Sequence, residues 1–207
     1  MQEFKVQDKR DDILDVAEKL FAEQGFEAIS VREISKAADI NIAMISYYFG
    51  SKEKLYEEVV NRKLISFDTY RSKIEALPTY KEKLFVMADV FVDKFFERRQ
   101  FQNIIFREMA MNQRTKMADK IATQLHQNFS FISDIIQKGI KHKEFKKVDV
   151  ELTVMSIIGI VRMYITSGTM ACKILQLDSE TDAFDQKQKN RLRKHLRELL
   201  INHLEIK

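Results

Sequence analysis

The sequence predicts an all-α protein, and three features of its composition support this prediction. The 207 residues include only one Pro and five Gly, whereas strand-rich folds use many of both in tight turns. Hydrophobic residues make up 45% and charged residues 32%, which is typical of a folded globular chain. The plentiful Lys, Glu, Leu, Ile and Ala suit long helices. We expect an N-terminal domain of three helices (1–50) and a C-terminal helical bundle (51–207).

The first expected helix covers residues 11–24 and ends at Gly25. Its apolar residues recur every three or four positions, as one buried helix face requires: Ile13, Leu14, Ala17, Leu20 and Phe21. Gly25 stands where a left-handed residue commonly closes a helix. A second helix starts at Ser30, because Ser30 and Glu33 have the spacing of a capping box.

A tight turn separates this second helix from a short third helix. Asp39 tolerates the left-handed backbone that such a turn needs, and Asn41 is a good N-cap for a helix over 42–49. Gly50 ends that helix, and Ser51 caps the next one. Many helical proteins contain such a corner, and it is also the geometry that lays a second helix in the DNA major groove.

Three segments of this region resemble the TetR/AcrR family of repressors. They are Ile13–Phe26, Ser30–Ala38 and Ile45–Leu55, and the most recognisable run is Tyr48-Phe-Gly-Ser-Lys52. The resemblance covers residues 8–58, about a quarter of the chain. It implies a helix-turn-helix regulator that binds operator DNA as a homodimer and takes a small-molecule effector in its C-terminal domain.

The resemblance also implies roles for single residues. Phosphate contacts are expected from Ser30, Tyr48 and Lys52, and base contacts from Ile42, Ala43, Ser46 and Tyr47. A small core is expected from Phe21, Ile45, Phe49 and Leu55. The chain departs from the family pattern at three positions. The family often has Gly where Asp39 stands, a basic or polar residue where Ile42 stands, and an aromatic residue where Ser46 stands.

Residues 41–51 carry no charge, so the commonest specific contact, from Arg or Lys to guanine, is absent from this helix. We therefore expect half-sites with A·T pairs, read by hydrogen bonds from Asn41, Ser46 and Tyr47 and by thymine-methyl contacts from Ile42 and Ala43. The net charge of +4 is not the DNA-binding signal, because residues 1–60 hold eight Lys and Arg against thirteen Asp and Glu. The basic excess lies in residues 138–147 and 186–207.

Further helices are expected over about 79–98, 101–113, 115–142, 150–173 and 183–205, with a loop over 177–183. Aromatic and Met side chains on these helices are candidates for an effector pocket, although the same spacing also suits an ordinary core: Phe91, Phe95, Phe106, Met109, Phe129, Met163 and Tyr164. Arg162 either pairs with an acid, lies at a dimer seam or anchors an anionic ligand.

The last two long helices are the expected homodimer surface, as the family resemblance implies. The apolar helix over 150–173 and the amphipathic helix over 184–204 offer surfaces for a four-helix seam between subunits. We expect a cytoplasmic protein, because Cys172 is the single cysteine and the sequence shows no secretory signal. We expect no membrane span, because the longest apolar stretch contains the charged Arg162. The sequence contains no Glu-x-x-His pair and no Gly-rich phosphate loop. We therefore expect no enzyme activity, no metal site and no cofactor. A ligand-dependent activator and a helical adaptor remain alternatives to a repressor.

Overall fold

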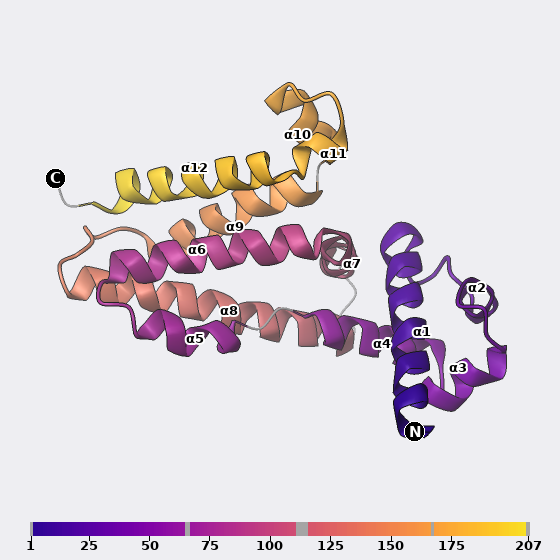
Figure 1. Cartoon of the computed structure of the whole chain (residues 1–207). Coiled ribbons are helices and arrows are strands. Elements are labelled where there is room, and N and C mark those ends of the chain that lie inside the picture. The colour runs from indigo at the N-terminus through magenta and orange to yellow at the C-terminus, as the bar shows by residue number, and fades with distance from the viewer. Residues whose placement is uncertain (1, 65–66, 111–115, 167, 206–207) are drawn as a thin grey trace. The chain divides into compact units, whose positions relative to one another are not determined.

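The computed structural model describes residues 2–64, 67–110, 116–166 and 168–205, and within these ranges it contains helices and no strands. This confirms the all-α prediction. In chain order (Figure 1) the helices are α1 (Gln2–Gln24), α2 (Val31–Ala37), α3 (Ile42–Phe49), α4 (Lys52–Lys63), α5 (Asp68–Glu75), α6 (Tyr80–Glu97), α7 (Arg99–Ala110), α8 (Lys116–Lys141), α9 (Val150–Thr166), α10 (Gly168–Leu175), α11 (Glu180–Ala183) and α12 (Gln186–Leu204).

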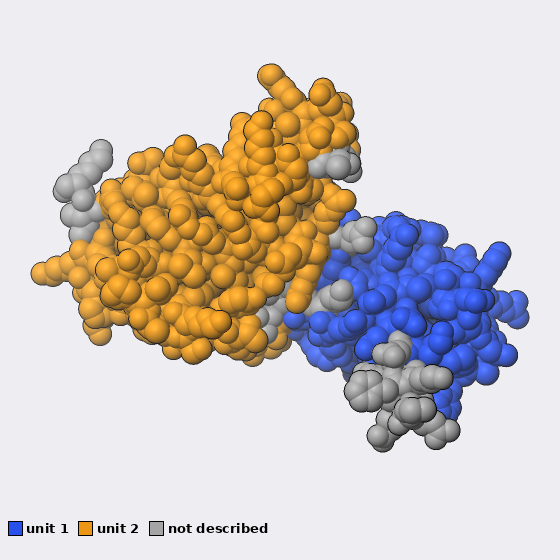
Figure 2. Space-filling view, viewed as in Figure 1, with its two compact units in different colours: residues 1–64, 100–122 blue, residues 65–99, 123–207 orange. Residues whose placement is uncertain are grey.

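Backbone contacts divide the chain into two compact units, which Figure 2 shows in different colours. The first unit contains Met1–Leu64 and Gln100–Ala122, and the second contains Ile65–Arg99 and Thr123–Lys207. The first unit thus groups α4 with α1, α2 and α3. The expected domain boundary after residue 50 stays a prediction.

The core of the first unit forms where α1 packs on α2 and α4, and α3 packs on α2 and α4. The four residues expected there, Phe21, Ile45, Phe49 and Leu55, are all less than 5% exposed. Burial of each such side chain contributes about 1.5–3 kcal/mol to stability. This small core fixes which face of α3 turns outward.

The turns between these helices follow the predicted chemistry. The Ser30 hydroxyl accepts from the Glu33 amide at 3.2 Å while the Ser30 amide donates to Glu33 Oε2 at 2.7 Å, which completes the capping box. Asp39 has a φ of 52°, as the tight turn requires. Asn41 Oδ1 accepts from the Ala43 amide at 2.8 Å and caps α3.

Gly25 closes α1 with a φ of 90°, and its amide donates to the Phe21 carbonyl at 2.9 Å. We expect Gly25→Ala to lower the free energy of unfolding by about 1–2 kcal/mol, because an L side chain is strained in this conformation. A Cβ here would also come within 2.2 Å of the Arg107 Nη1 atom. Urea unfolding of the variant checks this, with Gly25→Asn as the control. Asn tolerates left-handed backbone, so an equal loss in both variants would contradict the backbone explanation.

The second unit is built on α6, which packs against α5, α9 and α12. Figure 1 shows α6, α9 and α12 running alongside one another. Their inward residues are apolar and buried, for example Phe91, Ile157 and Leu196. Two acids of α6 pair with bases of α12: Asp93 with Lys189 (2.9 Å) and Arg193, and Asp89 with Arg197. Apolar packing and this row of ion pairs hold α12 on α6.

The prediction of one continuous helix over 150–173 is wrong, because α9 ends at Thr166 and a second helix, α10, begins at Gly168. The two helices are bent by 98° to each other. Glycine costs a helix interior about 1 kcal/mol relative to alanine, so the Gly at this position favours a break. No single helix among the described residues is long and apolar enough to span a bilayer. Only α9 and α10 taken together, despite the bend between them, have the length and apolar composition of a span.

Other boundaries differ by smaller amounts. The short helix α5 was not expected as a separate element, and one turn of helix, α11, lies in the segment 177–183 expected as a loop. Ser179 caps that turn by accepting from the Asp182 amide at 3.2 Å. The expected ends of two helices at residues 113 and 115 lie outside the described residues.

Candidate nucleic-acid interface

The short helix α3 has one buried face and one face open to solvent. Ile45 and Phe49, one turn apart, are 1% and 4% exposed and anchor the helix in the core. Tyr47 is 81% exposed, and Ile42 is 42% exposed. The other residues expected to contact bases are also exposed: Asn41, Ala43 and Ser46. The structure therefore brings all five expected base contacts onto the exposed surface of one short helix and its cap.

The two tyrosines of α3 differ in their surroundings. Their rings meet edge to face with centroids 5.2 Å apart, and Tyr48 is half-buried and lies 6.2 Å from the ring of Phe49. Tyr48 is thus oriented by its neighbours, whereas Tyr47 projects into solvent. An oriented side chain suits a phosphate contact at a fixed position, and a projecting ring suits contact with base edges.

Lys52 begins α4, directly after its N-cap Ser51, which accepts from the Lys54 amide at 3.2 Å. The Lys52 ammonium lies 4.2 Å from the centroid of the Phe26 ring, a cation–π contact. Lys52 is only half-buried, so its charge stays accessible. Free amides at a helix start also favour a phosphate, and the place of Lys52 therefore suits its expected role.

Two residues at helix caps already use part of their hydrogen-bonding capacity. The Ser30 amide and hydroxyl both donate to Glu33 Oε2 at 2.7 Å. These bonds, with a smaller contribution from Lys52, hold the pKa of Glu33 below its usual value, so the carboxylate stays charged. A phosphate contact from Ser30 would have to displace that carboxylate. Asn41 uses its carbonyl for the cap, which leaves its amide group to donate to a base.

We expect Lys52→Gln to weaken operator binding and to reduce its salt dependence. Each phosphate contact adds about 0.9 to the magnitude of the slope of log affinity against log salt concentration. A dimer that loses one contact in each subunit should therefore show a slope about 2 smaller in magnitude. Fluorescence anisotropy over a salt series measures this. Lys19→Gln, an exposed change on α1, is the control and should leave the slope unchanged. A slope that Lys52→Gln also leaves unchanged would remove the phosphate role.

The seven expected effector residues lie in different surroundings. Phe106 and Met109 belong to the first unit, and the other five to the second. Phe91 and Phe95 are buried, with centroids 4.3 Å apart, as in an ordinary core. Phe129 is half-buried, and Met163 is 46% exposed on the outer face of α9. The sequence could not separate these surroundings, because aromatic and Met residues at helical spacing suit all of them.

Tyr164 belongs to an aromatic cluster that the sequence did not reveal. Its ring lies 5.7 Å from Phe96 and 6.1 Å from Phe184, and its hydroxyl donates to the Ala183 carbonyl at 2.8 Å. Burial is the main cause that raises the pKa of Tyr164 to about 12. All three rings are half-buried, so this cluster is a better effector candidate than the closed Phe91–Phe95 pair.

The outer face of α9 is apolar and open. Leu152, Met155 and Met163 are 59%, 64% and 46% exposed, and a Cβ at Gly159 would meet nothing within 4 Å. Residues 152, 155, 159 and 163 follow helical spacing, so they share one stripe. A groove of about 600 Å³ runs between α9 and α12, lined by residues such as Ser156, His195 and Leu199. Arg162 lies exposed near this stripe.

Together, a helix-turn-helix with an exposed α3 and a separate helical unit with an open apolar face define a DNA-binding transcriptional regulator. Residues 13–59 match the family model of bacterial regulatory proteins of the tetR family, and residues 78–166 match a tetracyclin repressor-like C-terminal domain. The chain belongs to the TetR family of transcriptional regulators. This confirms the resemblance found in the sequence and extends it into the second unit.

Individual relatives agree with this assignment. YttP of Bacillus subtilis, a probable HTH-type transcriptional regulator, is 31% identical over 140 residues, 66% of this chain and 67% of that protein. The HTH-type transcriptional repressor KstR2 of Mycolicibacterium smegmatis is 29% identical over 149 residues, 70% and 71% of the two chains. The solved structure of the ketosteroid transcriptional regulator KstR2 of Mycobacterium tuberculosis shares the fold, with a TM-score of 0.77 over 96% of this chain and 95% of that one at 18% identity.

Proposed function

We propose that this chain is a ligand-responsive repressor that binds its operator as a homodimer and leaves it when a small hydrophobic or amphipathic molecule binds. The observation that carries the proposal is the exposed face of α3, where Tyr47 is 81% exposed above the buried anchors Ile45 and Phe49. A large aromatic side chain so exposed on a short anchored helix suits a surface that meets a partner. The uncharged, narrow helix suits the major groove.

The proposed dimer follows from the need for two half-sites. One short helix with no Arg or Lys supplies too few contacts for useful affinity, and a second copy doubles them. The open apolar stripe of Leu152, Met155 and Met163 on α9, beside the α9–α12 groove, is the proposed contact between subunits. A two-fold arrangement would lay the same stripe of each copy against the other.

The proposed effector site uses the half-buried rings Phe96, Tyr164 and Phe184 of the second unit. A repressor of M. smegmatis among the relatives supports repression as the default. In this proposal, an effector that favours one dimer spacing lowers operator affinity by changing the distance between the two α3 helices.

A gel shift with the full-length protein and the DNA upstream of its own gene tests the DNA-binding part. We expect a shift at nanomolar protein that competitor DNA of unrelated sequence does not remove, with half-sites that contain A·T pairs. Half-sites made only of G·C pairs would overturn the readout by Asn41, Ser46 and Tyr47. Failure to recover any promoter in a genome-wide pull-down would overturn the proposed function.

A further inference from the structure

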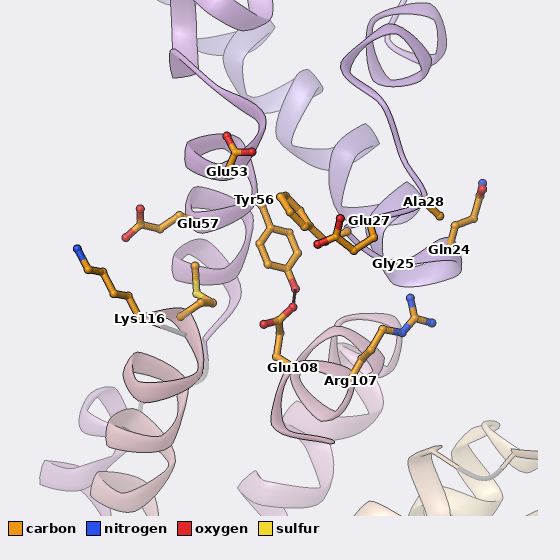
Figure 3. Close-up of a pocket in the computed structure, with 12 residues that line it drawn as sticks. Gln24, Gly25, Glu27, Ala28, Glu53, Tyr56, Glu57, Arg107, Glu108 and Lys116 are labelled. Carbon is orange, nitrogen blue, oxygen red and sulfur yellow. Dashed lines mark hydrogen bonds between the residues drawn. The ribbon is translucent and has the colours of Figure 1, made fainter. Parts of the chain in front are cut away.

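A cavity of about 600 Å³ opens within the first compact unit, and its lining includes none of the expected DNA-contacting or effector residues. Figure 3 shows its lining, which comes from the end of α1, the connector to α2, and the helices α4, α7 and α8. All of these residues belong to one unit. The cavity is therefore distinct from the aromatic cluster around Tyr164 in the second unit.

One wall of the cavity is aromatic and fixed in place. The Tyr56 ring packs against Phe21 at 5.0 Å and Phe26 at 4.8 Å between centroids. Its hydroxyl donates to Glu108 Oε1 at 2.7 Å, which ties α4 to α7. Burial and this bond raise the pKa of Tyr56 well above its usual value, so the phenol stays neutral and keeps donating. Met117 adds a further apolar side chain to the lining.

The other walls carry more negative than positive charge. Four carboxylates line the cavity, those of Glu27, Glu53, Glu57 and Glu108, against two bases, Arg107 and Lys116. Figure 3 shows Glu53 and Glu57 on one side of Tyr56, and Glu27 and Arg107 on the other. Three of the acids already have partners: Glu108 Oε1 accepts from the Tyr56 hydroxyl, Glu53 accepts a hydrogen bond from the Ser51 side chain, and Glu57 Oε1 lies 3.8 Å from Lys120 Nζ.

We propose that this cavity binds a small organic cation that carries a flat aromatic or apolar group. Cations are attracted to aromatic faces and to carboxylates, and the cavity offers both around one space. The protein itself shows this chemistry at the rim, where the Lys52 ammonium lies 4.2 Å from the centre of the Phe26 ring. The volume suits a molecule of drug-like size.

Binding here has a direct route to the DNA-contacting residues, a step that rests on the proposed function. Phe26 lines the cavity and also supports Lys52, the expected phosphate contact. Glu53 and Tyr56 follow Lys52 on the same helix. A cation that packs on Phe26 competes with the Lys52 ammonium and repositions it, so we expect operator affinity to fall.

Calorimetry on the full chain without DNA tests the site by itself. The probe is benzyltrimethylammonium, compared with benzyl alcohol as the neutral analogue and benzylsulfonate as the anionic one. We expect the cation to bind at least about tenfold more tightly than either analogue. The double variant Glu27→Gln/Glu57→Gln should weaken its binding by about five- to tenfold. The control Asp12→Asn/Glu23→Gln removes two exposed acids of α1 outside the lining, and it should bind the cation as the native chain does.

Each outcome decides the question. Equal binding of all three probes, or no heat with the cation at millimolar concentration, overturns the ligand class. Equal weakening by both double variants overturns the location. Operator affinity measured with and without saturating cation then tests the coupling alone. If the cation binds but the chain binds no operator, the site stands and the proposed function fails.

Discussion

Met155→Glu is expected to convert the dimer into monomers and to abolish tight operator binding. Met155 is 64% exposed in the single chain, so the change leaves the chain's own core intact. In the proposed seam the new carboxylate would be buried without a partner in both copies. An uncompensated buried charge costs about 3–5 kcal/mol, so two copies raise the dimer dissociation constant by at least about 1000-fold.

In the proposed function, operator binding depends on that dimer, because two linked half-sites give far higher affinity than either alone. Sedimentation equilibrium measures the oligomeric state, and a gel shift on the same sample measures DNA binding. The matched control is Val86→Glu, which places the same charge on α6, outside the residues of the α9 stripe, at a position 37% exposed. A Met155→Glu protein that stays dimeric would show that the subunits meet elsewhere.

Much of the first unit could be predicted from the sequence because its determinants are local. The capping box of Ser30 and Glu33, the cap at Asn41 and the positive φ at Gly25 and Asp39 each depend on residues within one turn. Such local preferences agree with the fold and with one another, so they are readable without tertiary contacts. The exposed face of α3 then follows, because the core residues fix the opposite face.

The second unit was less predictable, since its decisive contacts join residues far apart in the chain. The ring cluster of Tyr164 with Phe96 and Phe184 depends on how α6, α9 and the residue that follows α11 meet. One signal was present, because α9 carries apolar residues on both its inner and outer faces. A helix that is apolar all round is expected to be covered on both sides. The cavity beside Tyr56 left no such signal, because its lining joins charged residues from three separate helices and from the connector between α1 and α2.

Tyr47→Ala is expected to weaken operator binding by at least about 30-fold while leaving stability nearly unchanged. The Tyr47 side chain is 81% exposed, and removal of such a side chain alters the free energy of unfolding by about 0.5 kcal/mol or less. A lost base contact costs about 1–3 kcal/mol, and the dimer loses two. Binding to unrelated DNA should change little, since phosphate contacts dominate it.

The variant Tyr47→Phe separates the two parts of this contact. If the hydroxyl hydrogen-bonds an adenine or thymine edge, Tyr47→Phe should lose most of the operator affinity that Tyr47→Ala loses. If the ring packs on a thymine methyl, Tyr47→Phe should keep that affinity. Ile174→Ala, at a residue 65% exposed in the second unit, controls for loss of an exposed apolar side chain and should bind operator normally. Anisotropy titrations with specific and unrelated duplexes measure all of these. If Tyr47→Ala lowers affinity equally for the specific and the unrelated duplex, Tyr47 contacts the DNA phosphate backbone and not the bases, because sequence discrimination comes only from contacts that differ between bases.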